Sequence, residues 1–211
     1  MRLLKKYFWC IFLFFLILCL LYPFYINQNQ QLHERDMQLS KLNELLAVEK
    51  IYNSTYETNR DFEIFLNGKI IPFDSKVLGE KNEEIILKEM VKNNAIVLRY
   101  SELHCNACVD TMIHNLINVS KEMDNGNIIL LVTSQDTKYI TLLKKRKHIV
   151  FPIYRLTNEM DELLKDIDIP YYFVIQKNDK NMRINSVFVP LKENQELTYK
   201  YLNHVIQDYF K

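Results

Sequence analysis

The chain begins with a long apolar run. Residues 7–26 contain no charged side chain, and a helix of that length, at about 1.5 Å per residue, spans the roughly 30 Å hydrocarbon core of a bilayer. Arg2, Lys5 and Lys6 precede the run, so the positive-inside rule predicts a cytoplasmic N-terminus with all later residues outside. The run is long for a signal peptide and no small-x-small site follows it, which favours an uncleaved anchor over a cleaved signal or a buried soluble helix.

A polar stretch follows at residues 27–60. Its scattered leucines, among them Leu39, Leu42 and Leu46, form a short stripe with helical spacing. The stripe is too short to supply the several heptads of a stable coiled coil. We therefore expect a solvated, partly helical stalk, with a weak dimer contact along the stripe as the alternative.

From residue 61 the pattern is that of one globular domain, residues 61–211. Apolar segments 62–66 and 69–71 flank Asn67-Gly68, which predicts an N-terminal hairpin because both turn positions need positive φ. Hydrophobic spacing predicts helices at 83–92, 108–123, 137–147, 158–165 and 194–210, and strands at 95–100, 128–132, 149–151, 171–175 and 182–189. From the strand at 95–100 onward the order is β-α-β-α-β-α-β-β-α, which predicts an α/β sandwich large enough to bury its own core.

Composition and charge narrow the possible functions. Hydrophobic residues make up 48% and charged residues 25%, and the net charge of +1 gives no reason to expect nucleic acid as a partner. Of the four cysteines, Cys10 and Cys19 lie in the apolar run, where cysteine acts as a small hydrophobe. A single further pair, Cys105 and Cys108, is too few cysteines for a secreted disulfide scaffold. These two residues are therefore the candidate reactive site.

Cys105 and Cys108 lie where the predicted strand 95–100 gives way to the predicted helix 108–123. The thiolate is the nucleophile, and an ordinary cysteine with a pKa of about 8.5 is mostly protonated at neutral pH. A helix N-terminus favours the anion at Cys105, and the two-residue spacer brings Cys108 within reach of a mixed disulfide. We predict Cys105 as the nucleophile and Cys108 as the resolving thiol, with no cofactor and no metal.

These residues carry a resemblance to a known family. The strand, the CxxC and the helix after it, with Ile169-Pro170 leading into a late strand, resemble the thioredoxin superfamily. Together with the anchor they are similar to the membrane-tethered extracytoplasmic thioredoxin-like proteins of bacteria, over roughly residues 62–211. The resemblance implies a thioredoxin-like sandwich with an N-terminal hairpin. Asn67-Gly68-Lys69 resembles the turn region of that hairpin in this family. The resemblance also implies a cis Pro170 that lies against the dithiol and, with Ile169, binds substrate backbone.

The sequence departs from the family pattern around the dithiol. Arg99 stands where thioredoxins carry a buried acid, six residues before the first cysteine, and His104 stands where the family often has Trp. The inner dipeptide is Asn106-Ala107 rather than Gly-Pro. The group that transfers a proton when the second thiol is activated is therefore missing or replaced.

Three side chains are candidates to replace that group. Glu102 could relay a proton to Cys108, and a protonated His104 could stabilise the Cys105 thiolate. Arg99 could lower the pKa of a thiol or form a structural ion pair with Glu102. The alternative for His104 is a solvent-facing loop side chain.

Two classes of function stay open. The first is a thiol–disulfide oxidoreductase in the inner (plasma) membrane, with its domain in the periplasm or otherwise outside the cytoplasm. Its partners would be extracytoplasmic proteins with thiols or disulfides, a redox partner in the membrane, and the bilayer around residues 7–26. The second is a binding or redox-sensing module with little turnover. A zinc site with ligands from His104, Cys105, Cys108 and either His114 or His148 is a further alternative that the spacing does not select.

Overall fold

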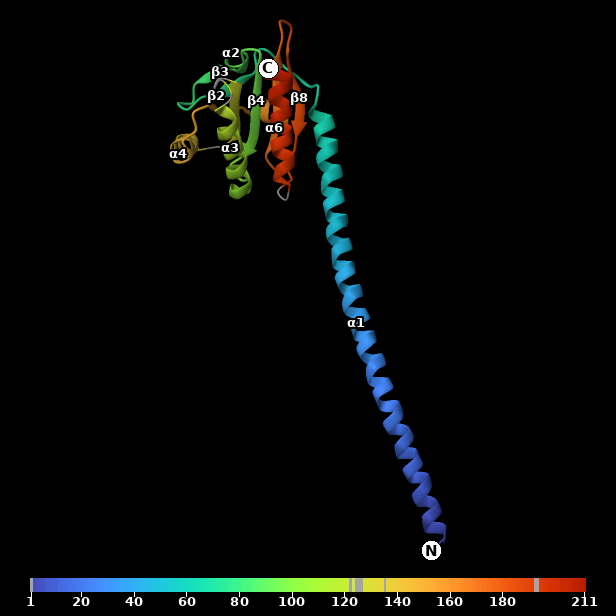
Figure 1. Ribbon diagram of the computed structural model, residues 1–211. Coiled ribbons are helices and arrows are strands. Elements are labelled where there is room, and N and C mark those ends of the chain that lie inside the picture. Colours follow the sequence, from blue (N-terminus) through green and yellow to red (C-terminus); the bar gives the residue numbers. More distant parts are fainter. Residues whose placement is uncertain (1, 122, 124–126, 135, 192–193) are drawn as a thin grey trace. The chain divides into compact units, whose positions relative to one another are not determined.

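The computed structural model describes two compact units, residues 1–57 and 58–211 (Figure 1). It describes the backbone of residues 2–121, 123, 127–134, 136–191 and 194–211, and their side chains except those of 2–15, 17, 18 and 137.

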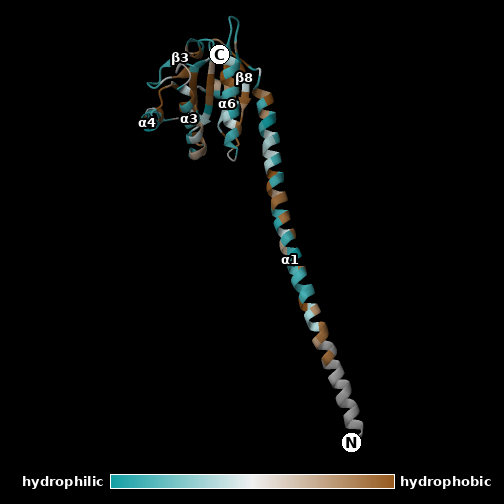
Figure 2. Ribbon diagram, viewed as in Figure 1, coloured by the Kyte–Doolittle hydropathy of each residue, from teal (hydrophilic) through white to brown (hydrophobic). Residues whose placement is uncertain are grey.

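The first unit is helical. Helix α1, Arg2–Leu66, accounts for it and continues into the second unit, so the predicted stalk at residues 27–60 has helical backbone throughout. Most side chains of the predicted membrane segment, residues 7–26, lie outside the described part. Within the described part of the chain, no helix is both long enough and apolar enough to cross a bilayer. Figure 2 shows the coloured part of α1 as mainly hydrophilic, with separate hydrophobic turns.

The second unit contains a mixed sheet. Among the described residues, eight strands pair in the order β1-β8-β7-β4-β5-β6-β2-β3. The strands are β1 (Ile70–Ile71), β2 (Lys76–Leu78), β3 (Glu84–Ile86), β4 (Asn94–Ser101), β5 (Ile128–Thr133), β6 (Ile153–Leu156), β7 (Tyr171–Lys177) and β8 (Met182–Phe188). Strands β4, β5 and β6 are parallel, whereas β7 runs antiparallel to β4 and β8 antiparallel to β7.

Helices cover both faces of this sheet. They are α2 (Leu87–Met90), α3 (Asn106–Ser120), α4 (Thr137–Lys147), α5 (Asn158–Leu164) and α6 (Gln195–Phe210). One core packs α3, α4 and α6 against alternate residues of β4, including Leu98, and Figure 1 shows α3 and α6 on this face. The other core packs α2, α5 and the end of α1 against the intervening residues, including Val97. The order from β4 to α6 confirms the predicted α/β sandwich.

The predicted hairpin at 62–66 and 69–71 is wrong. Residues Phe62 and Leu66 are buried while Ile64 is 66% exposed, which is the pattern of a helix face, and both buried residues belong to the last turns of α1. Asn67-Gly68 ends this helix rather than joining two strands. Gly68 has φ 85°, and its N–H donates to the carbonyl of Ile184 at 2.7 Å, which starts the pairing of β1 with β8.

The sandwich has a different N-terminal hairpin. Strands β2 and β3 pair antiparallel with Val77 opposite Ile85, so the predicted helix at 83–92 is also wrong. Its first half is strand β3 and only the four residues of α2 are helical. The adjacent β-branched residues Ile85 and Ile86 fit a pleated edge strand better than a helix.

The predicted strand at 149–151 lies four residues too early. Strand β6 begins at Ile153, which pairs with Leu130 of β5. Pro152 has no N–H to give to the ladder, so regular pairing starts after it. Ile149 and Phe151 are buried, but they contribute to the core from the connecting segment.

Candidate functional site

The two cysteines lie at the carboxyl end of the central strand. Strand β4 ends at Ser101, and Cys105 is the N-cap residue of α3, with φ −52° and ψ 113°. Its carbonyl accepts hydrogen bonds from the N–H groups of Cys108 at 3.0 Å and Val109 at 3.1 Å. Cys105 is exposed and Cys108 is half-buried. A nucleophile on the surface with a second thiol one turn behind it is the arrangement that thiol–disulfide exchange needs.

Ile169 and Pro170 lie at the same end of the sheet. Strand β7 pairs with β4 so that Tyr171 is opposite Arg99, which puts Pro170 level with the last residues of β4. Pro170 is buried and Ile169 is half-buried against the core. No peptide bond among the described residues is cis, so the prediction of a cis Pro170 is wrong. The trans form is the lower-energy isomer of an X–Pro bond.

Arg99 is fully buried and pairs with two carboxylates. Its Nη2 lies 2.7 Å from Asp161 Oδ1, and its Nη1 lies 2.8 Å from Asp166 Oδ1. Thr133 supports the first pair, because its Oγ1 donates to Asp161 Oδ1 at 2.7 Å and accepts from Arg99 Nη2 at 3.1 Å. A buried guanidinium is tolerated only when it is paired in this way.

The predicted ion pair between Arg99 and Glu102 is wrong. Side chains alternate along β4, and Arg99 points to the face covered by α5, where Asp161 lies. Glu102 lies beyond the end of the strand. Its carboxylate accepts a hydrogen bond from Ser134 Oγ at 2.6 Å. Glu102 is half-buried and stays close in sequence to the dithiol.

The Arg99–Asp166 pair is charged at neutral pH. Burial raises the pKa of Asp166, but the hydrogen bonds from Arg99 and His104 outweigh it and lower the pKa to about 2. Burial likewise opposes the charge on Arg99, yet its bonds to Asp166 and Asp161 raise the pKa of the guanidinium. The pair therefore persists over the whole physiological pH range.

His104 is buried rather than solvent-facing, with 6% of its surface exposed. Its Nδ1 accepts from the backbone N–H of Ser101 at 3.2 Å, and its Nε2 lies 2.9 Å from Asp166 Oδ1. Because a backbone N–H can only donate, Nδ1 carries no proton and Nε2 donates to the carboxylate. This geometry fits neutral His104, not the protonated form predicted to stabilise a thiolate. With both ring nitrogens engaged, His104 is also a poor zinc ligand.

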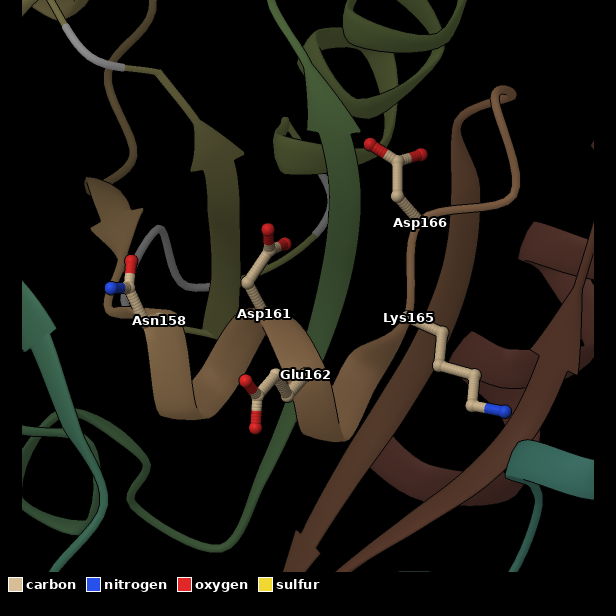
Figure 3. A pocket seen from close by; sticks show the side chains of 5 residues that line it. All are labelled: Asn158, Asp161, Glu162, Lys165 and Asp166. Atoms are coloured by element: carbon tan, nitrogen blue, oxygen red, sulfur yellow. The ribbon is translucent and has the colours of Figure 1, made fainter.

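A cavity opens on the solvent side of the Arg99–Asp166 pair, where Arg99 is buried and Asp166 is exposed. It has a volume of about 450 Å³ and is lined by Asn158, Asp161, Glu162, Lys165 and Asp166. Figure 3 shows the carboxylates of Asp161 and Asp166 beside the end of a central strand, while Lys165 points away from both. The two acids thus lie between solvent and Arg99.

Sequence reasoning missed Asp161, Asp166 and Leu103. A single arginine inside the apolar segment 95–100 was the available signal, because it requires counter-charges from the connections that meet that end of the sheet. Leu103 gave no signal in the sequence. In the structure it is 90% exposed, two residues before Cys105.

The comparisons with known proteins give likenesses of structure. No protein-family model and no curated protein matches this sequence. An electron transfer protein from Aquifex aeolicus is 16% identical, with a TM-score of 0.49 over 64% of this chain and 92% of that chain. The thioredoxin domain of a thiol-disulfide oxidoreductase from Bacteroides vulgatus is 10% identical, with a TM-score of 0.49 over 65% and 98% of the two chains.

A third solved structure is described as a protein disulfide isomerase from Bacteroides thetaiotaomicron. It is 14% identical, with a TM-score of 0.49 over 67% of this chain and 91% of that chain. At these identities and TM-scores, the likenesses assign no activity to this chain.

Proposed function

We propose that residues 58–211 form a thioredoxin-like domain that catalyses thiol–disulfide exchange through Cys105 and Cys108. The observation that carries the proposal is the position of Cys105, exposed at the N-cap of α3 with Cys108 half-buried one turn later. The first N–H groups of a helix have no partner within it, and with the helix dipole they favour a thiolate at this position.

The reaction follows from these two thiols. The Cys105 thiolate attacks one sulfur of a substrate disulfide, the substrate S–S bond breaks, and the departing thiolate takes up a proton. Cys108 then loses its proton and attacks Cys105 Sγ, which releases the second substrate thiol. Two electrons pass from the dithiol to the substrate and leave a Cys105–Cys108 disulfide. The reverse sequence oxidises a substrate dithiol.

Other residues have supporting roles in this proposal. Glu102 is the candidate to accept the proton of Cys108, because it is half-buried and close to the dithiol in sequence. Leu103 offers an apolar contact to the substrate, since it is almost fully exposed beside the nucleophile. Ile169 and Pro170 are the candidates to meet substrate backbone from the neighbouring loop.

Insulin reduction with dithiothreitol tests the proposal, with the full chain in detergent. Wild type should accelerate insulin precipitation, and Cys105→Ser should reduce the rate to that of dithiothreitol alone. Cys108→Ser should accumulate mixed disulfides through Cys105, visible on non-reducing gels. Equal rates for wild type and Cys105→Ser would exclude the catalytic function.

The second candidate is a redox-sensing or binding module with little turnover. The observation that favours it is Arg99, which occupies the place of a buried acid and is fixed in ion pairs. Such a module would form the Cys105–Cys108 disulfide in a glutathione series but would leave insulin reduction unaccelerated. The two measurements together separate the candidates.

We also propose that residues 7–26 anchor the chain in the plasma membrane with the domain outside the cytoplasm. The support is the uncharged sequence and the basic residues before it. The full chain should stay in the membrane fraction through alkaline carbonate extraction, and a membrane-impermeant maleimide should label Cys105 in intact spheroplasts. A chain that is released by carbonate, or that is labelled only after lysis, would contradict this topology. The expected partners are thiol- or disulfide-containing extracytoplasmic proteins and a redox partner in the membrane.

A further inference from the structure

One oxygen atom joins the segments on both sides of the dithiol. Asp166 Oδ1 lies 2.8 Å from Arg99 Nη1 in the central strand and 2.9 Å from His104 Nε2. The same oxygen accepts from the backbone N–H of Asp168 at 3.0 Å. His104 directly precedes Cys105, and Asp166 lies in the connection from α5 to Pro170. The carboxylate therefore links the strand, the residue before the nucleophile and the neighbouring loop.

The turn before Cys105 is closed around the His104 ring. The backbone N–H of His104 donates to the carbonyl of Ser101 at 3.0 Å, and the Ser101 N–H donates to His104 Nδ1. With Nε2 bonded to Asp166, the ring is held at both nitrogens. The path of the chain from β4 to Cys105 thus depends on the orientation of this ring.

Asp166 is well suited to hold that orientation. Hydrogen bonds to a charged acceptor are shorter and about twice as strong as neutral ones. The Arg99 end of the link is fully buried and is also paired with Asp161. Asp161 provides an internal comparison, since it pairs with the same guanidinium through Nη2 but bonds to Thr133 instead of His104.

We propose that Asp166 is a positioning residue for Cys105. Through His104 it fixes the turn that leads into α3, and so keeps the Cys105 sulfur at the helix N-terminus. Asp166 acts through His104, and its role rests on the proposed function of Cys105 as the nucleophile.

Alkylation of Cys105 by iodoacetamide tests this role without requiring turnover. The full chain with Cys10→Ala, Cys19→Ala and Cys108→Ser leaves one thiol to react. In this background Asp166→Ala should slow alkylation at pH 7 by roughly threefold or more and move the pH profile upward, because the sulfur loses its fixed place at the helix end. Asp161→Ala, the matched control, should leave both unchanged.

Two further variants examine the route through His104. Asp166→Asn keeps an oxygen that accepts from His104 Nε2, so its alkylation rate should lie closer to wild type than that of Asp166→Ala. His104→Ala should slow alkylation as much as Asp166→Ala, and the double variant should be no slower than the slower single variant. Circular dichroism shows whether Asp166→Ala folds. If it does not, the test is the alkylation rate of His104→Ala, which should be slower than that of Asp161→Ala.

Three results would overturn the inference. They are an unchanged alkylation profile in Asp166→Ala, equal slowing by Asp161→Ala, and additive effects of Asp166→Ala and His104→Ala. Failure of the proposed function would look different. Wild type would then not accelerate insulin reduction, while the alkylation rates of the variants would still differ as described.

Discussion

Arg99 Nη2 and Asp161 Oδ1 meet at 2.7 Å, and the guanidinium has no exposed surface while 30% of the aspartate side chain is exposed. The central strand therefore holds a cation that solvent does not reach, neutralised by acids that solvent does reach. This asymmetry means that loss of the cation and loss of one acid should have different consequences for stability.

Arg99→Ala should lower the free energy of unfolding by about 3 kcal/mol or more, because it leaves a cavity and deprives two carboxylates of their partner. Asp161→Ala should lower it by about 1–2 kcal/mol, since Asp166 still pairs with the guanidinium. Urea unfolding of the full chain, followed by near-UV circular dichroism, measures both.

Arg99→Met is the control for volume. It fills the space without the charge, and the partly exposed acids can be hydrated, so it should cost less than Arg99→Ala. A loss below about 1 kcal/mol for Arg99→Ala would show that the ion pairs of Arg99 do not contribute to stability.

Acid should weaken the fold through Asp166. Its folded-state pKa of about 2 is depressed from the ordinary 3.8, so its contribution to stability is full above the unfolded pKa and is lost as pH falls through the folded value. Wild type should therefore lose unfolding free energy between about pH 5 and 2, and Asp166→Asn should lose less of it over the same interval. Urea unfolding at a series of pH values gives the slope of unfolding free energy against pH for wild type and for Asp166→Asn. Parallel slopes would contradict the depressed pKa of Asp166.

The sequence was sufficient for much of the fold. The strand predicted at 95–100 and the helix predicted at 137–147 are both present in the structure. The end of α1 could not be predicted, because Phe62 and Leu66 lie on one face of either a helix or a strand. Only the sheet onto which they pack distinguishes the two. Likewise, the start of β6 depends on its register with β5, which sequence spacing does not contain.

At the site, the sequence predicted where the functional residues lie better than it predicted their interaction partners. The strand-to-helix position of Cys105 follows from local spacing. The counter-charges of Arg99 do not, because Asp161 and Asp166 are more than sixty residues away in the chain. Glu102 was the nearest acid in sequence, but it lies beyond the end of β4 and bonds to Ser134. The counter-charges come from α5, which covers that face of the sheet, and from the connection after it, and only tertiary packing identifies them.

Gly68 should tolerate substitution poorly although it has open space around it. Its φ of 85° lies in the left-handed region, and a Cβ there would meet no atom within 4 Å, so any cost comes from the backbone. Gly68→Ala should lower the free energy of unfolding by about 1 kcal/mol. Gly68→Asn, which adopts this conformation more readily, should lose less in the same urea unfolding experiment. Equal losses would mean that φ is not the cause.

Leu103 should affect substrate handling without affecting stability. It is 90% exposed, so Leu103→Ser removes almost no buried apolar surface and should change the free energy of unfolding by less than about 0.5 kcal/mol. If the side chain contacts substrate beside Cys105, the same change should slow insulin reduction several-fold while iodoacetamide alkylation of Cys105 stays at the wild-type rate, because the small reagent needs no apolar contact. Leu197→Ser, at a partly exposed leucine on α6, is the control and should slow neither reaction. Slowing of both reactions by Leu103→Ser would instead indicate a disturbed turn before the dithiol, and an unchanged insulin rate would remove Leu103 from the substrate contacts.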